Sequence, residues 1–115
     1  MKQSINTVTI QGFLGSNPEV KEFAPNKSLA RVSVATNESF KNSDGEWVEK
    51  TEWHNLVFWG KWASFAELNL QKGMKVHITG KLTNRQYKTS NDESRYVTEI
   101  NVSSAHVVEK ESKGE

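Results

Sequence analysis

Residues 51–60 read Thr-Glu-Trp-His-Asn-Leu-Val-Phe-Trp-Gly and form the most informative stretch of the chain. Successive side chains of a β-strand point to opposite faces of the sheet. Read with this period of two, one face of the stretch carries Trp53, Asn55, Val57 and Trp59, and the other carries His54, Leu56 and Phe58. The pattern predicts a strand with large apolar side chains on both faces.

Apolar side chains on both faces need two different environments. Either the strand is packed between two layers, or one of its faces meets a flat ligand. Rings beside positive charge suit a single-stranded nucleic acid, because bases stack on the rings and phosphates meet ammonium groups. Trp53 and Trp59 could instead fill a core or a subunit interface, where aromatics are common. Leu56 and Phe58 can already fill the core and Lys61 is adjacent, so the pattern favours stacking.

The composition describes one globular domain without redox or membrane signals. The chain has 115 residues, of which 35% are hydrophobic and 25% charged, a globular balance. It contains no cysteine, which excludes disulfides and thiolate ligands. No apolar run approaches the ~20 residues that span a bilayer, and residues 1–6 lack the apolar part of a signal peptide. We expect a soluble, intracellular protein.

The overall charge gives no support to a nucleic-acid ligand. The 15 Lys and Arg against 14 Asp and Glu leave a net charge of only +1, whereas nucleic-acid binders are usually basic. Binding would therefore depend on where the charges lie, and on stacking as much as on Coulomb attraction.

The rest of the chain reads as strands separated by turn signals. Strands are predicted at residues 5–10, 29–36, 51–59, 74–82 and 96–108, with a short extended piece at 19–23 and a helix at 61–70. Five strands with one short helix between strands 3 and 4 is the order of an OB fold, a partly open Greek-key barrel. The predicted fold class is all-β, an OB-fold barrel in one domain over residues 1–108. Residues 109–115 are predicted to form a polar flexible tail.

Alternation also predicts the core. Shared-face apolar positions in the second and fourth strands are Ala30, Val32, Val34, Val76, Ile78 and Leu82. Trp62 lies on the predicted inward face of the helix and is assigned to the core.

Several short segments together resemble bacterial single-stranded DNA-binding proteins. They begin with Gly-Phe-Leu-Gly at 12–15, Asn-Pro-Glu-Val at 17–20 and Val-Ala-Thr-Asn-Glu-Ser-Phe at 34–40. Lys-Thr-Glu-Trp-His at 50–54 is the most specific, and Gly-Lys at 60–61, Gly-Lys-Leu at 80–82 and Arg-Tyr-Val-Thr-Glu at 95–99 follow. In order and spacing these segments cover residues 5 to 108.

The resemblance implies a function and a set of site residues. It implies sequence-tolerant binding and protection of single-stranded DNA in replication, recombination and repair, by a cytoplasmic, nucleoid-associated homotetramer. The implied stacking rings are Phe40, Trp53, Trp59 and Tyr87, the implied phosphate contacts are Lys21, Lys61, Lys72 and Arg85, and His54 is implied to lie near a subunit contact. The family usually has Trp at the first and last ring positions and Phe at the third, so this chain differs at three of four while keeping a ring each time.

One departure concerns partner proteins. Family members usually continue into a flexible linker with an acidic Pro-Phe tip that recruits replication and repair enzymes. The sequence stops at Lys113-Gly114-Glu115. It is either a truncated form or a short paralogue, and the resemblance therefore gives no basis for recruitment of replication and repair proteins through such a tail.

Two other ligand classes stay open, and catalysis is disfavoured. The rings could form the interface of an OB-fold protein-interaction module in a primosome-like assembly. Single-stranded RNA is also possible, since every base has a π-face. No nucleophile with a nearby base and no Gly-rich phosphate loop is present, so no enzyme is predicted. His54, His77 and His106 are scattered over different strands, so neither a metal site nor a cofactor is expected.

Overall fold

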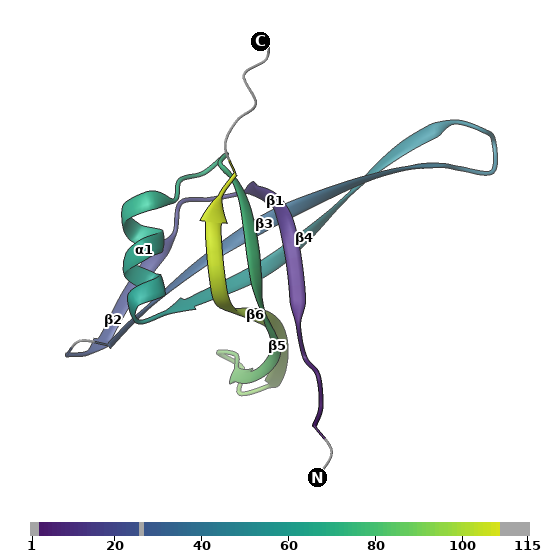
Figure 1. Ribbon diagram of the computed structural model, residues 1–115. Coiled ribbons are helices and arrows are strands. Elements are labelled where there is room, and N and C mark those ends of the chain that lie inside the picture. The colour runs from purple at the N-terminus through teal and green to yellow at the C-terminus, as the bar shows by residue number, and fades with distance from the viewer. Residues whose placement is uncertain (1–2, 26, 109–115) are drawn as a thin grey trace.

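The computed structural model describes residues 3–25 and 27–108. They form, in chain order, β1 (Val8–Leu14), β2 (Glu19–Ala24), β3 (Lys27–Lys41), β4 (Trp47–Trp59), α1 (Lys61–Asn69), β5 (Lys75–Lys88) and β6 (Ser94–Val107) (Figure 1). The predicted tail, residues 109–115, lies outside the described residues. Within the described residues, no helix is both long and apolar enough to cross a membrane.

Five of the strands close into a barrel, as predicted. They follow the order β1-β5-β6-β4-β3, and β1 returns to β3 through the pairs Phe13 with Ala35 and Leu14 with Val34. A Cβ at position 12 would overlap the carbonyl oxygen of Ala35. The barrel can therefore close here only because residue 12 is a glycine.

The strand count differs from the prediction. Glu19–Ala24 is a true strand, β2, because it pairs with β3 outside the closed ring. The described residues therefore form six strands. The helix follows β4, which is the fourth strand of the chain, whereas the sequence predicted that it would follow the third. A short extended piece could not be recognised as a strand without knowing that β3 offers it a free edge.

The interior is filled by the faces that alternation predicted, with one exception. Val34, Phe58 and Ile78 are fully buried, and Trp62 of α1 packs against this cluster. Leu82 was predicted to be buried but is 48% exposed. It follows Gly80, which is paired with Val8 at the end of the β1–β5 register, so β1 does not continue alongside it.

β3 and β4 continue past the barrel as a two-stranded hairpin, the arm (residues 37–51), which projects far from the body of the molecule (Figure 1). Buried residues of these strands end at Ala35 and begin again at Leu56. The Cα radius of gyration is 16.9 Å, against about 13 Å for a compact chain of this length. The arm therefore has no core of its own and makes the molecule elongated.

Candidate nucleic-acid interface

Trp53 and Trp59 lie on the outer face of β4, where they are 59% and 43% exposed. Their cross-strand partners on β3 are Ala35 and Leu29. Six residues of strand separate them, about 20 Å. Both indoles lie at the surface of the monomer, on the one face that the period of two predicted.

Trp53 has a neighbour that alternation does not reveal. Its six-membered ring occupies the space that a Cβ of Gly15 would need. Phe13, exposed on β1, is the cross-strand partner of Ala35 and so lies on the same outer face. The ammonium group of Lys75 lies 5.8 Å from the centre of the Phe13 ring. Phe13 adds an exposed ring in the cross-strand row of Trp53, with Ala35 between them, and this ring was not predicted from the sequence.

Trp59 also has an aromatic partner that was missed. Its ring meets that of Phe23 edge to face, with centroids 5.7 Å apart and planes at 87°. The two rings, with Lys27, line an open pocket of about 380 Å³. Lys21, a predicted phosphate contact, pairs with Leu29, which pairs with Trp59, so Lys21 lies in the same cross-strand row. Alternation along residues 19–23 places Phe23 on the same face as Lys21. This pattern could have predicted that Phe23 lies near Lys21 and Trp59.

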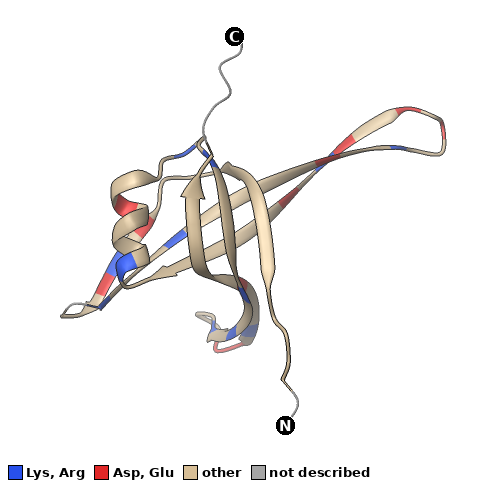
Figure 2. Ribbon diagram, viewed as in Figure 1, with Lys and Arg blue, Asp and Glu red and all other residues tan. Residues whose placement is uncertain are grey.

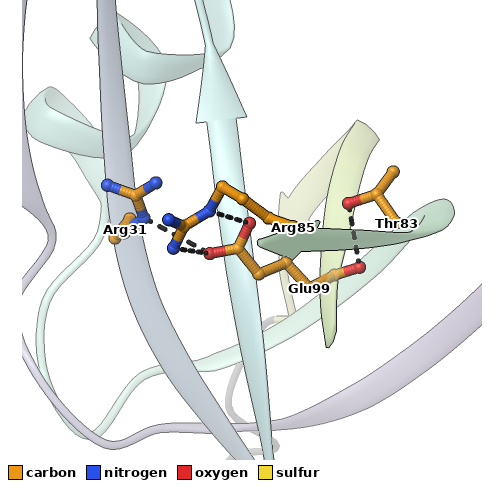
Figure 3. Close-up of polar contacts among 4 residues, drawn as sticks. All are labelled: Arg31, Thr83, Arg85 and Glu99. Atoms are coloured by element: carbon orange, nitrogen blue, oxygen red, sulfur yellow. Dashed lines mark hydrogen bonds and ion pairs between the residues drawn. The ribbon is translucent and has the colours of Figure 1, made fainter. Parts of the chain in front are cut away.

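Between the two tryptophans the outer face carries a cluster of three charged residues. Glu99 of β6 accepts hydrogen bonds from Arg85 of β5, at 3.3 Å to Nε and 3.0 Å to Nη2, and from Nε of Arg31 of β3, at 3.4 Å (Figure 3). Glu99 is only 7% exposed. Burial disfavours its charge, but the hydrogen bonds from Arg85 and the charges of both arginines outweigh burial and hold the pKa of Glu99 below its ordinary value. The hydrogen bond to Glu99 raises the pKa of Arg85.

This cluster borders a surface hollow of about 320 Å³. Its polar lining comes from Arg31, Ser33, Asn55, Arg85 and Glu99. Asn55 lies on the strand face of the tryptophans and between them. The Arg85 guanidinium lies 5.8 Å from the centre of the exposed Tyr87 ring. The structure thus brings Arg85 and Tyr87 together, and the hollow lies between Trp53 and Trp59.

Phe40 is not on the strand face of the other rings. Its cross-strand partner in the arm is Val48, so it follows the alternation of the inner face. Trp47, near the tip, is 69% exposed and has the Lys41 ammonium 5.7 Å from its ring centre. Four acidic residues and two lysines lie in the arm. Phe40 therefore stands on an acidic arm.

The predicted lysines are exposed but are dispersed. Lys61 begins α1 directly after the pocket residue Gly60, and the backbone N–H of Lys72 donates to Asn17 in the turn after β1. Figure 2 shows acidic and basic residues interspersed over the described residues, with acidic positions prominent on the arm. The charge pattern agrees with the small net charge. Arg31 and Arg85 are brought together because both pair with Glu99.

The histidines are less scattered than predicted. His77 and His106 lie on different strands, but those strands are paired, and the two rings stack with centroids 5.1 Å apart. His54 is half-buried and is joined to Thr36 by a hydrogen bond of 2.9 Å. Over the stretch that the structure describes, no three metal-ligating side chains come together.

Comparisons with known proteins agree with this geometry. Residues 5–108 match the Single-strand binding protein family. The chain belongs to this family. Over 101 residues it is 40% identical to the single-stranded DNA-binding protein 1 of Chlorobaculum tepidum, a match that covers 87% of this chain and 62% of that protein. The chain thus spans less than two thirds of that relative.

The fold is shared with a solved structure of a protein in complex with DNA. The structure described as Plasmodium falciparum SSB complex with ssDNA matches with a TM-score of 0.86 at 27% identity, over 95% of this chain and 99% of that one. The resemblance read from the sequence segments and the OB-fold barrel are both confirmed.

Proposed function

We propose that this protein binds single-stranded DNA with little sequence preference and protects it during replication, recombination and repair. The observation that carries this proposal is the exposure of Trp53 and Trp59 on one outer strand face, on either side of a hollow bordered by two arginines. Base stacking contributes roughly 1–3 kcal/mol per base and tolerates any sequence. Membership of the family and the DNA-bound structural relative support the same ligand.

The proposed contacts fall into two groups. The stacking rings are Trp53, Trp59 and Tyr87 on the barrel, with Phe40 on the arm. The phosphate contacts are Lys21, Lys61, Lys72 and Arg85. We propose no catalytic activity, because binding and protection require only this surface.

The proposal includes assembly into a homotetramer. β1 pairs with β5 from Val8 to Phe13, and with β3 only at Phe13 and Leu14. Most of its second edge thus has no strand partner among the described residues, and an open edge is a template for pairing with another chain. We place His54 near a subunit contact and expect a cytoplasmic, nucleoid-associated protein.

The test replaces both tryptophans by alanine. Trp53→Ala/Trp59→Ala should weaken oligo-dT binding at least ~10-fold, because two stacking platforms are lost. Oligo-dT should also quench the tryptophan emission of the unchanged protein. Leu68→Ala is the matched control, since Leu68 is a strongly exposed apolar residue on α1. Unchanged binding in a folded double variant would remove the stacking hypothesis, and competition between DNA and RNA oligomers of equal sequence identifies the preferred nucleic acid.

A protein-interaction module is the second candidate function. The acidic arm with the exposed ring of Trp47 favours it, because aromatic residues are enriched in protein interfaces. In that case oligo-dT would leave the emission unchanged, and emission would respond to dilution of the protein instead.

A further inference from the structure

Glu99 is a carboxylate in an unexpected place. It is the one charged side chain that is buried among residues 3–25 and 27–108, and it belongs to the outer face where we propose that a polyanion binds. Its neighbours on β6, Ile100 and Val102, point into the core. A buried anion on such a face would repel phosphates, so its presence requires a physical reason.

The contacts of Glu99 leave cationic hydrogen-bond donors unused. Arg85 reaches the carboxylate through Nε and Nη2, which leaves Nη1. Arg31 reaches it through Nε, which leaves both terminal nitrogens, and Figure 3 shows both guanidinium groups reaching the shared carboxylate. Arg31 and Arg85 come from strands β3 and β5, which do not pair with each other. The carboxylate is what holds these two cations at one place.

We propose that the hollow beside Glu99 is a subsite for one backbone phosphate of the bound strand, with Arg31 and Arg85 as its donors and Glu99 as the positioning residue. The inference rests on the proposed function and extends it to Arg31 and Glu99. Two arginines and one carboxylate carry a net charge of +1, which one phosphate oxygen anion neutralises. Planar guanidinium groups recognise phosphate through paired N–H donors, and fixing their orientation beforehand lowers the entropy cost of binding.

The position of the hollow fits the path of a strand whose bases stack on the rings. Asn55 and the cross-strand partner of Arg31, Val57, both lie between Trp53 and Trp59 on the outer face. Arg85 lies beside Tyr87. A DNA strand whose bases stack on the β4 tryptophans and on Tyr87 must carry its sugar-phosphate backbone past this hollow.

The test uses the sign of the effect of Glu99→Gln. Removing an acid from a DNA-binding surface ordinarily strengthens binding, because repulsion of the polyanion falls. If Glu99 positions the arginines, the same change weakens oligo-dT binding, by roughly five- to tenfold for one weakened charge-assisted contact. Glu19→Gln is the matched control: Glu19 is exposed and is the cross-strand partner of Arg31. Loss of the Glu19 charge should leave oligo-dT binding unchanged or strengthen it.

A second readout separates positioning from a general loss of structure. The log–log dependence of affinity on salt should become shallower by about 0.7 in Glu99→Gln, the value for one lost phosphate contact with a single strand. In an Arg31→Gln/Arg85→Gln background, which leaves Glu99 without its cations, Glu99→Gln should instead strengthen binding. A purely structural role would weaken binding in both backgrounds with an unchanged slope.

Three outcomes are decisive. Weaker binding with a shallower slope, reversed in the double-arginine background, supports the subsite. Equal or tighter oligo-dT binding by folded Glu99→Gln overturns it while leaving the proposed function intact. Failure of the unchanged protein to bind oligo-dT overturns the proposed function itself and the subsite with it.

Discussion

Gly15 is important for the position of Trp53, because a residue without a side chain leaves room for the indole ring. The six-membered ring of Trp53 occupies the volume of the missing Cβ, and the same ring is largely open to solvent. A glycine in the turn after β1 thus sets the position of a ring on β4. Such a contact stabilises the fold little, but it orients the surface on which a base would stack.

Gly15→Ala should move the Trp53 ring and spare the barrel. The new methyl group would meet the far end of an exposed side chain, which can rotate away. We expect a melting temperature close to that of the unchanged protein and oligo-dT affinity lowered about threefold, part of the loss expected for one stacking platform. Gly12→Ala is the contrast, because its methyl group would meet the carbonyl of Ala35 and should destabilise the barrel. Unaltered affinity and emission in Gly15→Ala would contradict the contact.

Glu99 should make stability depend on pH on the acid side. Its pKa is lowered in the folded protein because Arg85 and Arg31 outweigh the effect of burial. The unfolded chain therefore takes up the proton at higher pH than the folded chain. The stability that Glu99 contributes is present above the ordinary glutamate pKa of about 4.3 and is lost as pH falls through the lower folded value.

Urea unfolding between neutral and acid pH measures this loss. Other carboxylates titrate in the same range, so the comparison is with Glu99→Gln, whose free energy of unfolding should fall less steeply below about pH 4.3. Parallel curves for the two proteins would show that the arginines do not stabilise the ionised carboxyl group.

At the scale of elements, the arm is separable from the barrel. Buried residues of β3 and β4 stop at Ala35 and Leu56, so the arm contributes hydrogen bonds between its own strands but no core. Glu38 and Lys50 are cross-strand partners, so Asn-Gly can join them in place of residues 39–49 with a two-residue hairpin turn.

This shortened protein should still fold. We expect its melting temperature to stay within about 5 °C, the shift that ~1 kcal/mol produces in a domain of this size. Its oligo-dT affinity should fall less than that of Trp53→Ala/Trp59→Ala, because the arm carries one proposed platform, Phe40, among acidic residues. Loss of cooperative unfolding would contradict the independence of the barrel. A larger affinity loss than in the double tryptophan variant would make the arm the main binding element.

At the scale of the whole molecule, the net charge of +1 limits the electrostatic share of binding. Each neutralised phosphate contributes about −0.7 to the log–log slope of affinity against salt, so three to five contacts predict a slope between about −2 and −4. Titration of oligo-dT at increasing NaCl, followed by tryptophan emission, measures it. A slope steeper than about −6 would mean that phosphate contacts dominate over stacking.

The sequence predicted the parts of this molecule that local periodicity controls. The outward tryptophans and inward Leu56 and Phe58 follow from alternation within one strand. Glu99 and Arg31 meet across 68 positions of sequence, and only barrel closure brings them together. Periodicity also assigns a face without saying whether anything covers that face, which is why Leu82 was misassigned.

The projecting arm has a practical consequence for hydrodynamic measurements. Because the arm projects from the barrel, the hydrodynamic radius of one copy exceeds that of a sphere of equal mass. A single copy should therefore leave a gel-filtration column earlier than a globular 13.0 kDa standard. Early elution would thus imitate self-association. Light scattering measures mass independently of molecular shape. Shortening the arm should delay elution by more than the deleted mass explains.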